Sequence, residues 1–360
     1  MEKKKIILFV VIAILIVILG VGVAAMLSER NDETLDPNIE AKDEEKVNED
    51  EEVVEESAVK IFNEKSNERP IAYMIDNNRN AQPQSSINKA FVVYEIIVEG
   101  NETRLMAIFK GLDEATVGPI RSARHYFLDY AAEYDAIYAH LGLSPKADDD
   151  MKMYGTNNIN GQIYDTGAAR NNASIYWRSS ERKAPHNAYT SIETIKRILP
   201  NLGYKDTTTK GTPLNYSVEE ITLDSEDAIV ATDVEIPYGG GHLVNYKYDE
   251  ETGRYTRYSK GRKQTDYESK EDATTKNLII TFAKNTDLPD TENKGRQDVH
   301  TTGTLDGYYI TNGKAIKIKC VKETRQSQTK YLDLEGNEIK INDGNTWINI
   351  CPINADVTFE

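Results

Sequence analysis

Charged residues stand among the apolar runs of residues 92–124, and this pattern constrains the fold of the chain more than any other. Two glutamates lie in or just after one apolar run, an arginine precedes the next run, and two more arginines follow a Gly-Pro pair. These residues are Glu95, Glu99, Arg104, Arg121 and Arg124. A charge that is buried without a partner is costly. We therefore expect these charges to meet at the ends of buried segments, either as a binding site or as a network of ion pairs.

Short apolar runs rich in β-branched and aromatic residues predict buried strands in the first half of the chain. These runs are Ile71–Ile75, Phe91–Val98, Arg104–Lys110 and Asp135–Gly142. Before the last of them, the apolar residues of segment 123–131 recur at helical spacing. Ser122 or a near neighbour is the expected N-cap of that helix.

The second half of the chain has a different pattern from the first. The first half closes with a capping-box pattern at residues 190–193, which opens a helix that ends within residues 200–203. Alternating strands and helices predict a mixed α/β domain over residues 67–212. Residues 213–360 instead show short strand-like runs separated by Gly and Asn turns. They predict a mostly antiparallel β domain.

Two cysteines, Cys320 and Cys351, end strand-like runs in the β-rich segment. Outside the cytoplasm they could form a disulfide, and a loop of this length would contribute about 3–4 kcal/mol of stability. The alternative is that both are small buried hydrophobic side chains. Because no Cys/His pattern with zinc-ligand spacing is present, we expect no zinc site.

The N-terminal segment predicts a membrane anchor. Three lysines precede an uninterrupted apolar run at residues 6–27, which is long enough to cross the hydrocarbon core of a bilayer as a helix. The lysines should remain in the cytoplasm, so residues 1–28 would form a single-pass anchor with the bulk of the chain outside the cell. The alternative is a cleaved signal peptide, whose apolar region is shorter.

Residues 29–66 predict an acidic, disordered tether between the anchor and the first domain. Segment 29–58 contains fourteen Asp or Glu and three Lys or Arg, and such a composition cannot bury enough apolar surface to become ordered. It supplies most of the formal net charge of −16, so the remainder is only mildly acidic. Nucleic acid is therefore not an expected partner, because binding it requires a basic face.

Several polar residues at predicted strand ends, loops and helix starts form the candidate ligand site. They are Asp76, Asn77, Glu95, Glu99, Arg104, Arg121, Arg124, His140, Ser144, His186 and Asn187. Arginines near the start of a helix suit phosphate or carboxylate groups. Nearby carboxylates could hold a divalent cation such as Mg²⁺ that bridges to the same phosphate, although no metal ligand can be assigned by spacing.

The alternative for these charges is a purely structural role. The glutamates and arginines of segment 92–124 could simply neutralise one another and fix a turn. His140 and His186 are more often strand-end or loop histidines than ligands. A serine nucleophile at Ser144 has no supporting elbow motif.

Ordered motifs along the chain resemble the YerB-like family of bacterial cell-envelope proteins. In the first half they are RPIAYMIDN, AQPQS, VYEIIVEGNETRLMAIF, VGPIRSARHYFLDYAAEYDAIYAH, LSPKA and KAPHNAYT. In the second half they are YTRYSKG, TTGTLDGYYITNGKAI and DLEGNEIKINDGNTWINICP. The resemblance implies an N-terminal and a C-terminal region and an envelope location, and it implies no reaction. Family members are often lipoproteins, whereas this chain has an apolar run; Leu143 and Cys320 also depart from the family's pattern.

Two functions are compatible with these features. The first is a non-catalytic envelope protein that binds an anionic wall component or a partner protein through the α/β domain. The second is a metal-assisted phosphotransferase or hydrolase acting on phosphate-linked cell-wall glycan, with the arginines stabilising phosphate charge and Asp76 or Glu95 holding the metal.

Overall fold

The computed structural model describes residues 59–63, 65–165, 170–171, 173–289 and 292–360. All of them belong to one compact unit, Glu56–Glu360. No helix formed by these residues has the length and apolarity needed to cross a membrane. The predicted membrane span at residues 6–27, like residues 29–58 of the predicted tether, lies outside the described residues.

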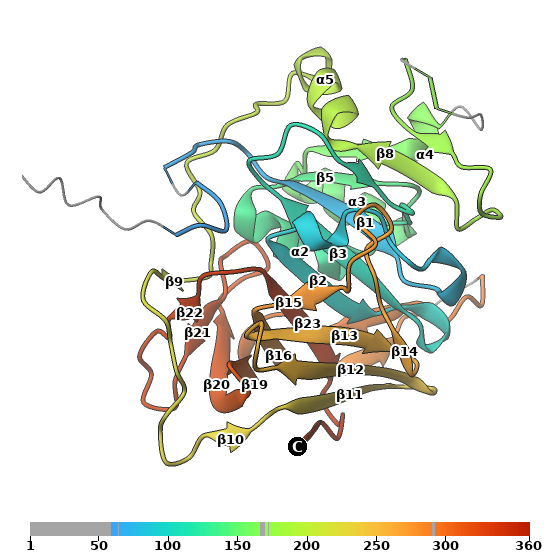
Figure 1. Ribbon diagram of the computed structural model, residues 1–360. Coiled ribbons are helices and arrows are strands. Elements are labelled where there is room, and N and C mark those ends of the chain that lie inside the picture. Colours follow the sequence, from blue (N-terminus) through green and yellow to red (C-terminus); the bar gives the residue numbers. More distant parts are fainter. Residues whose placement is uncertain (1–58, 64, 166–169, 172, 290–291) are drawn as a thin grey trace, which may run out of the picture. The chain divides into compact units, whose positions relative to one another are not determined.

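A large sheet of eleven strands forms the centre of the unit, in the order β10-β20-β19-β16-β23-β2-β3-β1-β5-β6, with β21 pairing β20 (Figure 1). Strands from the first half of the chain are β1 Ile71–Asp76, β2 Val92–Ile97, β3 Thr103–Phe109, β5 Ile137–His140 and β6 Asn158–Asn160. Strands from the second half are β10 Ile229–Val230, β16 Asn277–Ala283, β19 Gly303–Thr311, β20 Lys314–Lys322, β21 Lys330–Leu332 and β23 Thr346–Pro352. The mixed α/β fold with mostly strand content is confirmed.

Strand β23 joins the two halves of the chain within this sheet. It pairs in parallel with β2 on one side and with β16 on the other, so Ile348 lies between Tyr94 and Ile279. Its first six residues are all buried, as expected for a strand covered on both faces in the middle of a sheet. The sheet therefore crosses the predicted boundary at residues 212 and 213, and the division into two domains stays a prediction.

A second sheet of six strands has one buried face. Its order is β14-β13-β12-β11-β24, with β15 pairing β13. The strands are β11 Asp233–Gly239, β12 His242–Asp249, β13 Arg254–Ser259, β14 Arg262–Lys263, β15 Thr274–Thr275 and β24 Thr358–Phe359. Alternating burial along β11 and β13 gives one inward and one outward face.

Three smaller sheets and a few short helices complete the unit. The small sheets contain β4 Thr116–Val117, β7 Trp177–Arg178 and β8 Ala188–Ser191, then β9 Tyr216–Ser217 with β22 Ile341–Asn342, and β17 Asn285–Asp287 with β18 Gln297–Val299. The α-helices are α2 His125–Ala131, α3 Pro145–Tyr154, α4 Gly161–Tyr164 and α5 Ile192–Leu202. Single 3-10 turns are η1 Arg79–Ala81, η2 Ile87–Lys89, η3 Glu99–Asn101 and η4 Ala132–Tyr134.

The helix starts differ slightly from those predicted. Helix α2 has its N-cap at Arg124, two residues after Ser122 and within the predicted range. The capping box of α5 lies one residue later than the predicted box at residues 190–193: Ser191 is the N-cap, and the hydroxyl of Thr194 accepts the return hydrogen bond from the Ser191 backbone. Helix α3 was not predicted, and Ser144 caps it by accepting a hydrogen bond from the backbone of Ala147.

The central strand β2 shows how three layers meet (Figure 1). Tyr94 points to the helical side, where its ring stacks on Tyr130 of α2 at 4.8 Å between centroids. The next residue, Glu95, points to the opposite face and pairs with Arg257 of β13. Successive side chains of a strand face opposite ways, so the large sheet lies between α2 and the six-stranded sheet.

The last residues of the predicted tether pack against the folded unit. The backbone amides of Lys60 and Ile61 donate to the carboxylate of Asp343. The ring of Phe62 lies 5.0 Å from that of Phe91. These contacts place residues 60–62, which the predicted tether 29–66 included, with the folded unit.

Both cysteines are buried and free. Cys320 lies in β20 and its sulfur accepts a hydrogen bond from Thr281, while Cys351 lies in β23. Burial raises the pKa of the Cys320 thiol to about 12. The alternative of two small buried hydrophobic side chains therefore describes them, and no disulfide joins them.

Gly307 in the middle of β19 offers a direct test of the packing. A Cβ at this position would lie 2.3 Å from the carbonyl oxygen of Ile280 on the neighbouring strand. We expect Gly307→Ala to lower the free energy of unfolding by about 1–3 kcal/mol, as over-packed sites do, measured by urea denaturation. Gly211→Ala is the control because a Cβ there would have nothing within 4 Å and its backbone is unstrained. Equal stability of the two variants would contradict the packing described.

Candidate functional site

A cleft of about 320 Å³ opens where the ends of β1 and of the β2–β3 hairpin meet the segment before α2. It is lined by Asp76, Asn78, Val98, Glu99, Glu102, Thr103, Arg104, Arg121, Arg124, His186 and Lys294. Six of these were candidate residues from the sequence: Asp76, Glu99, Arg104, Arg121, Arg124 and His186. We call this cavity the arginine cleft.

Local strand pairing brings most of these side chains together. Antiparallel pairing of β1 with β3 sets Asp76 opposite Arg104. The turn of the hairpin at η3 contains Gly100 with φ of 68°, a left-handed conformation that glycine adopts without strain. The segment before α2 runs beside β1, where the amide of Arg121 donates to the carbonyl of Met74 at 2.8 Å.

Glu99 is the main acceptor for two of the arginines. Arg124 donates to both carboxylate oxygens of Glu99, at 2.5 Å and 2.8 Å, in the two-pronged geometry that gives strong pairs. Arg104 lies 3.6 Å from the same carboxylate and donates to the carbonyl of Ser122. Burial acts to raise the pKa of Glu99, but the hydrogen bond and charge of Arg124 and the charge of Arg104 lower it overall.

Asp76 organises the other side of the cleft. Its carboxylate accepts a hydrogen bond from His186 Nδ1 at 2.8 Å and lies 3.4 Å from Arg121 Nε. Its second oxygen accepts from the backbone of Asn78 at 3.0 Å. Of the three arginine side chains, Arg121 is the most exposed, at 30 %.

Positive charge exceeds negative charge in the cleft. Three arginines face two carboxylates, Asp76 and Glu99. The other two charged lining residues pair outside the cleft: Glu102 accepts a hydrogen bond from Lys260 at 2.9 Å, and Lys294 lies 2.7 Å from Glu292. The pKa of Arg104 falls to about 10, first because it is buried and then because the charges of Arg124 and Arg121 repel its own. The three arginines therefore outnumber the carboxylates that face them inside the cleft.

Glu95 and Asn77 do not line the cleft but belong to a buried cluster that borders it at Thr103. Glu95 accepts hydrogen bonds from Arg257 at 2.7 Å, Thr103 at 2.7 Å and Asn77 at 3.0 Å. His242 lies 3.4 Å from the same carboxylate. We call this set the Glu95 cluster. The expectation that Glu95 belongs with the arginines of segment 92–124 is wrong, because alternation along β2 turns it to the six-stranded sheet.

His140, Ser144 and Asn187 also have structural surroundings. His140 is fully buried, and its ring nitrogens contact the carbonyl of Gly142 at 2.8 Å and the amide oxygen of Asn158 at 3.1 Å. Ser144 caps α3. Asn187 donates to the carbonyl of Ser179 at 3.0 Å and so braces the loop that carries His186. None of the three lines the arginine cleft.

Sequence reasoning missed several residues of the two clusters. Glu102 and Thr103 belong to the same hairpin as Glu99 and could have been included on that ground. Lys294 is far along the chain from the other cleft residues, and Arg257 and His242 come from β13 and β12. No local pattern marks these three.

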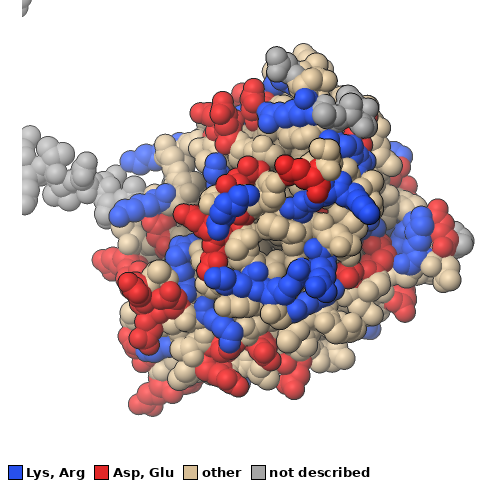
Figure 2. Space-filling model, turned by 45° about the vertical axis from the view of Figure 1, so that its right-hand side comes forward, with Lys and Arg blue, Asp and Glu red and all other residues tan. Residues whose placement is uncertain are grey.

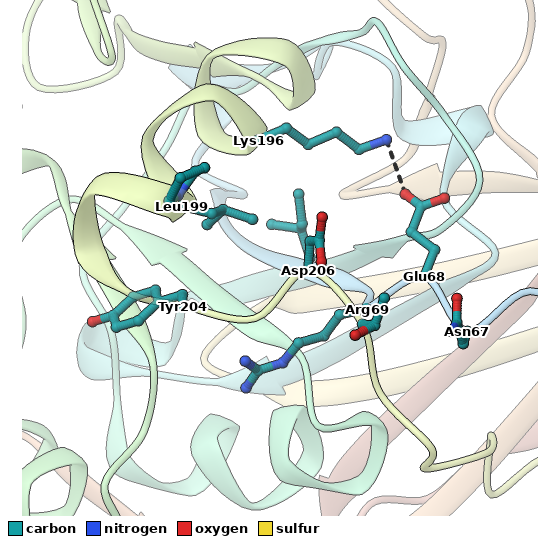
Figure 3. A pocket seen from close by; sticks show the side chains of 10 residues that line it. Asn67, Glu68, Arg69, Lys196, Leu199, Tyr204 and Asp206 are labelled. Atoms are coloured by element: carbon teal, nitrogen blue, oxygen red, sulfur yellow. Dashed lines mark ion pairs between the residues drawn. The ribbon is translucent and has the colours of Figure 1, made fainter. Parts of the chain in front are cut away.

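A larger cavity of about 400 Å³ lies between α5 and the loops at residues 67–69 and 204–207 (Figure 3). Two of its cationic groups form ion pairs: Lys196 with Glu68 at 2.9 Å, and Arg69 with Asp135 at 2.9 Å. Because these charges are paired and no candidate residue lines this cavity, the smaller arginine cleft is the better candidate site.

The arrangement of carboxylates bears on metal binding. Among the residues that the structure describes, no group of three or more His, Cys, Asp or Glu side chains is placed to hold a metal ion. The metal-assisted alternative assigned that role to Asp76 or Glu95. Asp76 is hydrogen-bonded to His186 and lies close to Arg121. Glu95 accepts a hydrogen bond from Arg257. Each carboxylate therefore faces cationic or hydrogen-bonding groups of the protein.

Comparison with known proteins places the chain in a family. A family model described as "Protein of unknown function (DUF3048) N-terminal domain" matches residues 57–205, and the corresponding C-terminal domain matches residues 234–348. The Bacillus subtilis (strain 168) protein "Putative lipoprotein YerB" is 32 % identical over 295 residues, 79 % of this chain and 81 % of the relative. The chain belongs to the YerB-like family. The crystal structure of YerB from Bacillus subtilis superposes with a TM-score of 0.69 at 31 % identity, covering 81 % of this chain and 94 % of that one.

Proposed function

We propose that this YerB-like protein binds an anionic, phosphate- or carboxylate-bearing component of the cell envelope in the arginine cleft. The observation that carries the proposal is the surplus of positive charge in a cleft where Arg104 is nearly buried and only weakly paired, 3.6 Å from Glu99. Charge-assisted hydrogen bonds from guanidinium groups are among the strongest that a protein offers to such anions.

An envelope location is part of the proposal. The relative's name describes a lipoprotein, and the apolar run at residues 6–27 supplies this chain with a membrane anchor of its own.

The surface of the folded unit carries both charges: in Figure 2, Lys and Arg side chains gather around a shallow hollow with Asp and Glu side chains nearby. An anionic wall polymer or an envelope protein would be the partner.

Arg121 is the residue best suited to test anion binding. It is partly exposed and 3.4 Å from Asp76, so its removal should disturb the fold little. We expect Arg121→Ala to weaken binding of inorganic phosphate about tenfold or more, because a hydrogen bond to a charged group contributes about 1.5–3 kcal/mol. Calorimetric titration at low and high salt measures this affinity.

Arg79→Ala is the matched control, since Arg79 is an exposed arginine of η1 that does not line the cleft. Its affinity for phosphate should equal that of the unmodified protein. If neither phosphate nor acetate binds the unmodified protein at low salt, the cleft is an ion-pair network and the proposed function is wrong.

A further inference from the structure

One histidine in the arginine cleft is held in the geometry of a general base. His186 Nδ1 lies 2.8 Å from Asp76 Oδ2. The other ring nitrogen, Nε2, has no hydrogen-bond partner among the described residues, and the side chain is 17 % exposed. The histidine lines the same cavity as Arg104, Arg121 and Arg124.

Both members of this pair are firmly held. The carboxylate of Asp76 is 5 % exposed and is fixed through its other oxygen by the amide of Asn78. The loop that carries His186 is held by a hydrogen bond from the backbone amide of His186 to the carbonyl of Lys183 at 3.0 Å. The side chain of Asn187 also holds this loop. A carboxylate at Nδ1 favours the tautomer with its proton there, which leaves the lone pair of Nε2 facing away from Asp76.

We propose that Asp76 and His186 form a dyad that activates water, so that the arginine cleft hydrolyses a phosphoester. This inference rests on the proposed function, because the arginines must first hold the phosphoryl group. The choice of a phosphoester over a carboxylic ester follows from the guanidinium groups. A phosphoryl group carries negative charge in the ground state and the transition state, which the arginines stabilise, whereas an ester carbonyl is neutral when it binds.

The step balances with water as the only co-reactant. A water proton moves to His186 Nε2 while the water oxygen forms a bond to phosphorus. The bond from phosphorus to the leaving oxygen breaks, and its electron pair stays on that oxygen. The imidazolium then returns the proton to the leaving oxygen, which gives an alcohol and a phosphate. Asp76 is the positioning residue, because it holds the imidazole and stabilises its cation without touching the substrate.

The test uses the purified full chain with two chromogenic esters, p-nitrophenyl phosphate and bis(p-nitrophenyl) phosphate. We expect release of p-nitrophenol from at least one ester, and the pair distinguishes monoester from diester substrates. His186→Asn should lower kcat at least 100-fold, the scale of general-base catalysis, while the Kd for inorganic phosphate changes less than threefold. His300→Asn is the matched control because His300 is exposed and lies outside the cleft.

A second variant distinguishes chemistry from a structural effect. Added imidazole should raise the rate of ester hydrolysis by the His186→Ala variant at least tenfold. A merely structural role of the histidine would not allow this rescue. If the unmodified protein binds phosphate but hydrolyses neither ester, or if His186→Asn keeps full activity, the dyad proposal is wrong and anion binding stands. If phosphate does not bind at all, the proposed function itself is wrong.

Discussion

Arg257→Met should lower the free energy of unfolding by about 3–5 kcal/mol, the cost of leaving one partner of a buried ion pair without the other. Arg257 is about 1 % exposed and its Nη2 lies 2.7 Å from Glu95 Oε2. Its guanidinium also lies over the ring of Trp347, 4.8 Å from the centroid, so a cation–π contact is lost with it. Urea unfolding followed by tryptophan fluorescence measures the change.

Two further variants make this prediction specific. Arg262→Met on the neighbouring strand β14 removes an exposed arginine and should change stability by less than about 0.5 kcal/mol. The double variant Glu95→Gln with Arg257→Met should recover part of the loss, since no uncompensated charge is left buried. A single variant Arg257→Met as stable as the unmodified protein would show that the Glu95 cluster does not hold the two sheets together.

Acid should destabilise the protein through Glu95 in a defined range. Burial acts to raise the pKa of Glu95, but the charge of Arg257 with the hydrogen bonds of His242 and Thr103 lowers it from 4.5 to about 2. Because the folded pKa lies below the unfolded value, the stabilisation is present above pH 4.5 and is lost as the pH falls towards 2. A shift of this size corresponds to stability on the order of 3 kcal/mol.

Comparison with Glu95→Gln isolates this contribution from those of other carboxyl groups. Some of them act in the opposite direction: burial raises the pKa of Asp129, although Arg325 and Thr301 lower it in part. The difference in unfolding free energy between the unmodified protein and Glu95→Gln should therefore shrink between pH 4.5 and 2. A difference that stays constant over this range would mean that Glu95 is not a buried, paired carboxylate.

Local sequence was sufficient to predict the elements that surround the arginine cleft. The strands at Ile71 and Arg104 and the helix after Arg121 appear within a few residues of their predicted bounds. Their apolar periodicity reflects contacts that each segment makes with its immediate neighbours. Asp76 and Arg104 lie opposite each other because β1 and β3 are adjacent antiparallel strands. The last residue of β1 therefore lies beside the first residues of β3.

The apolar and charged pattern of residues 92–124 by itself determined the strand pair, the helix that follows and four charged residues of the cleft that lie near one another in the chain: Glu99, Arg104, Arg121 and Arg124. The tertiary structure alone decided the partner of Glu95, since Arg257 is 162 residues away. It alone also placed β23 between β2 and β16. The physical reason is that periodicity records whether a side chain is buried, whereas the identity of its partner depends on which distant strand covers that face.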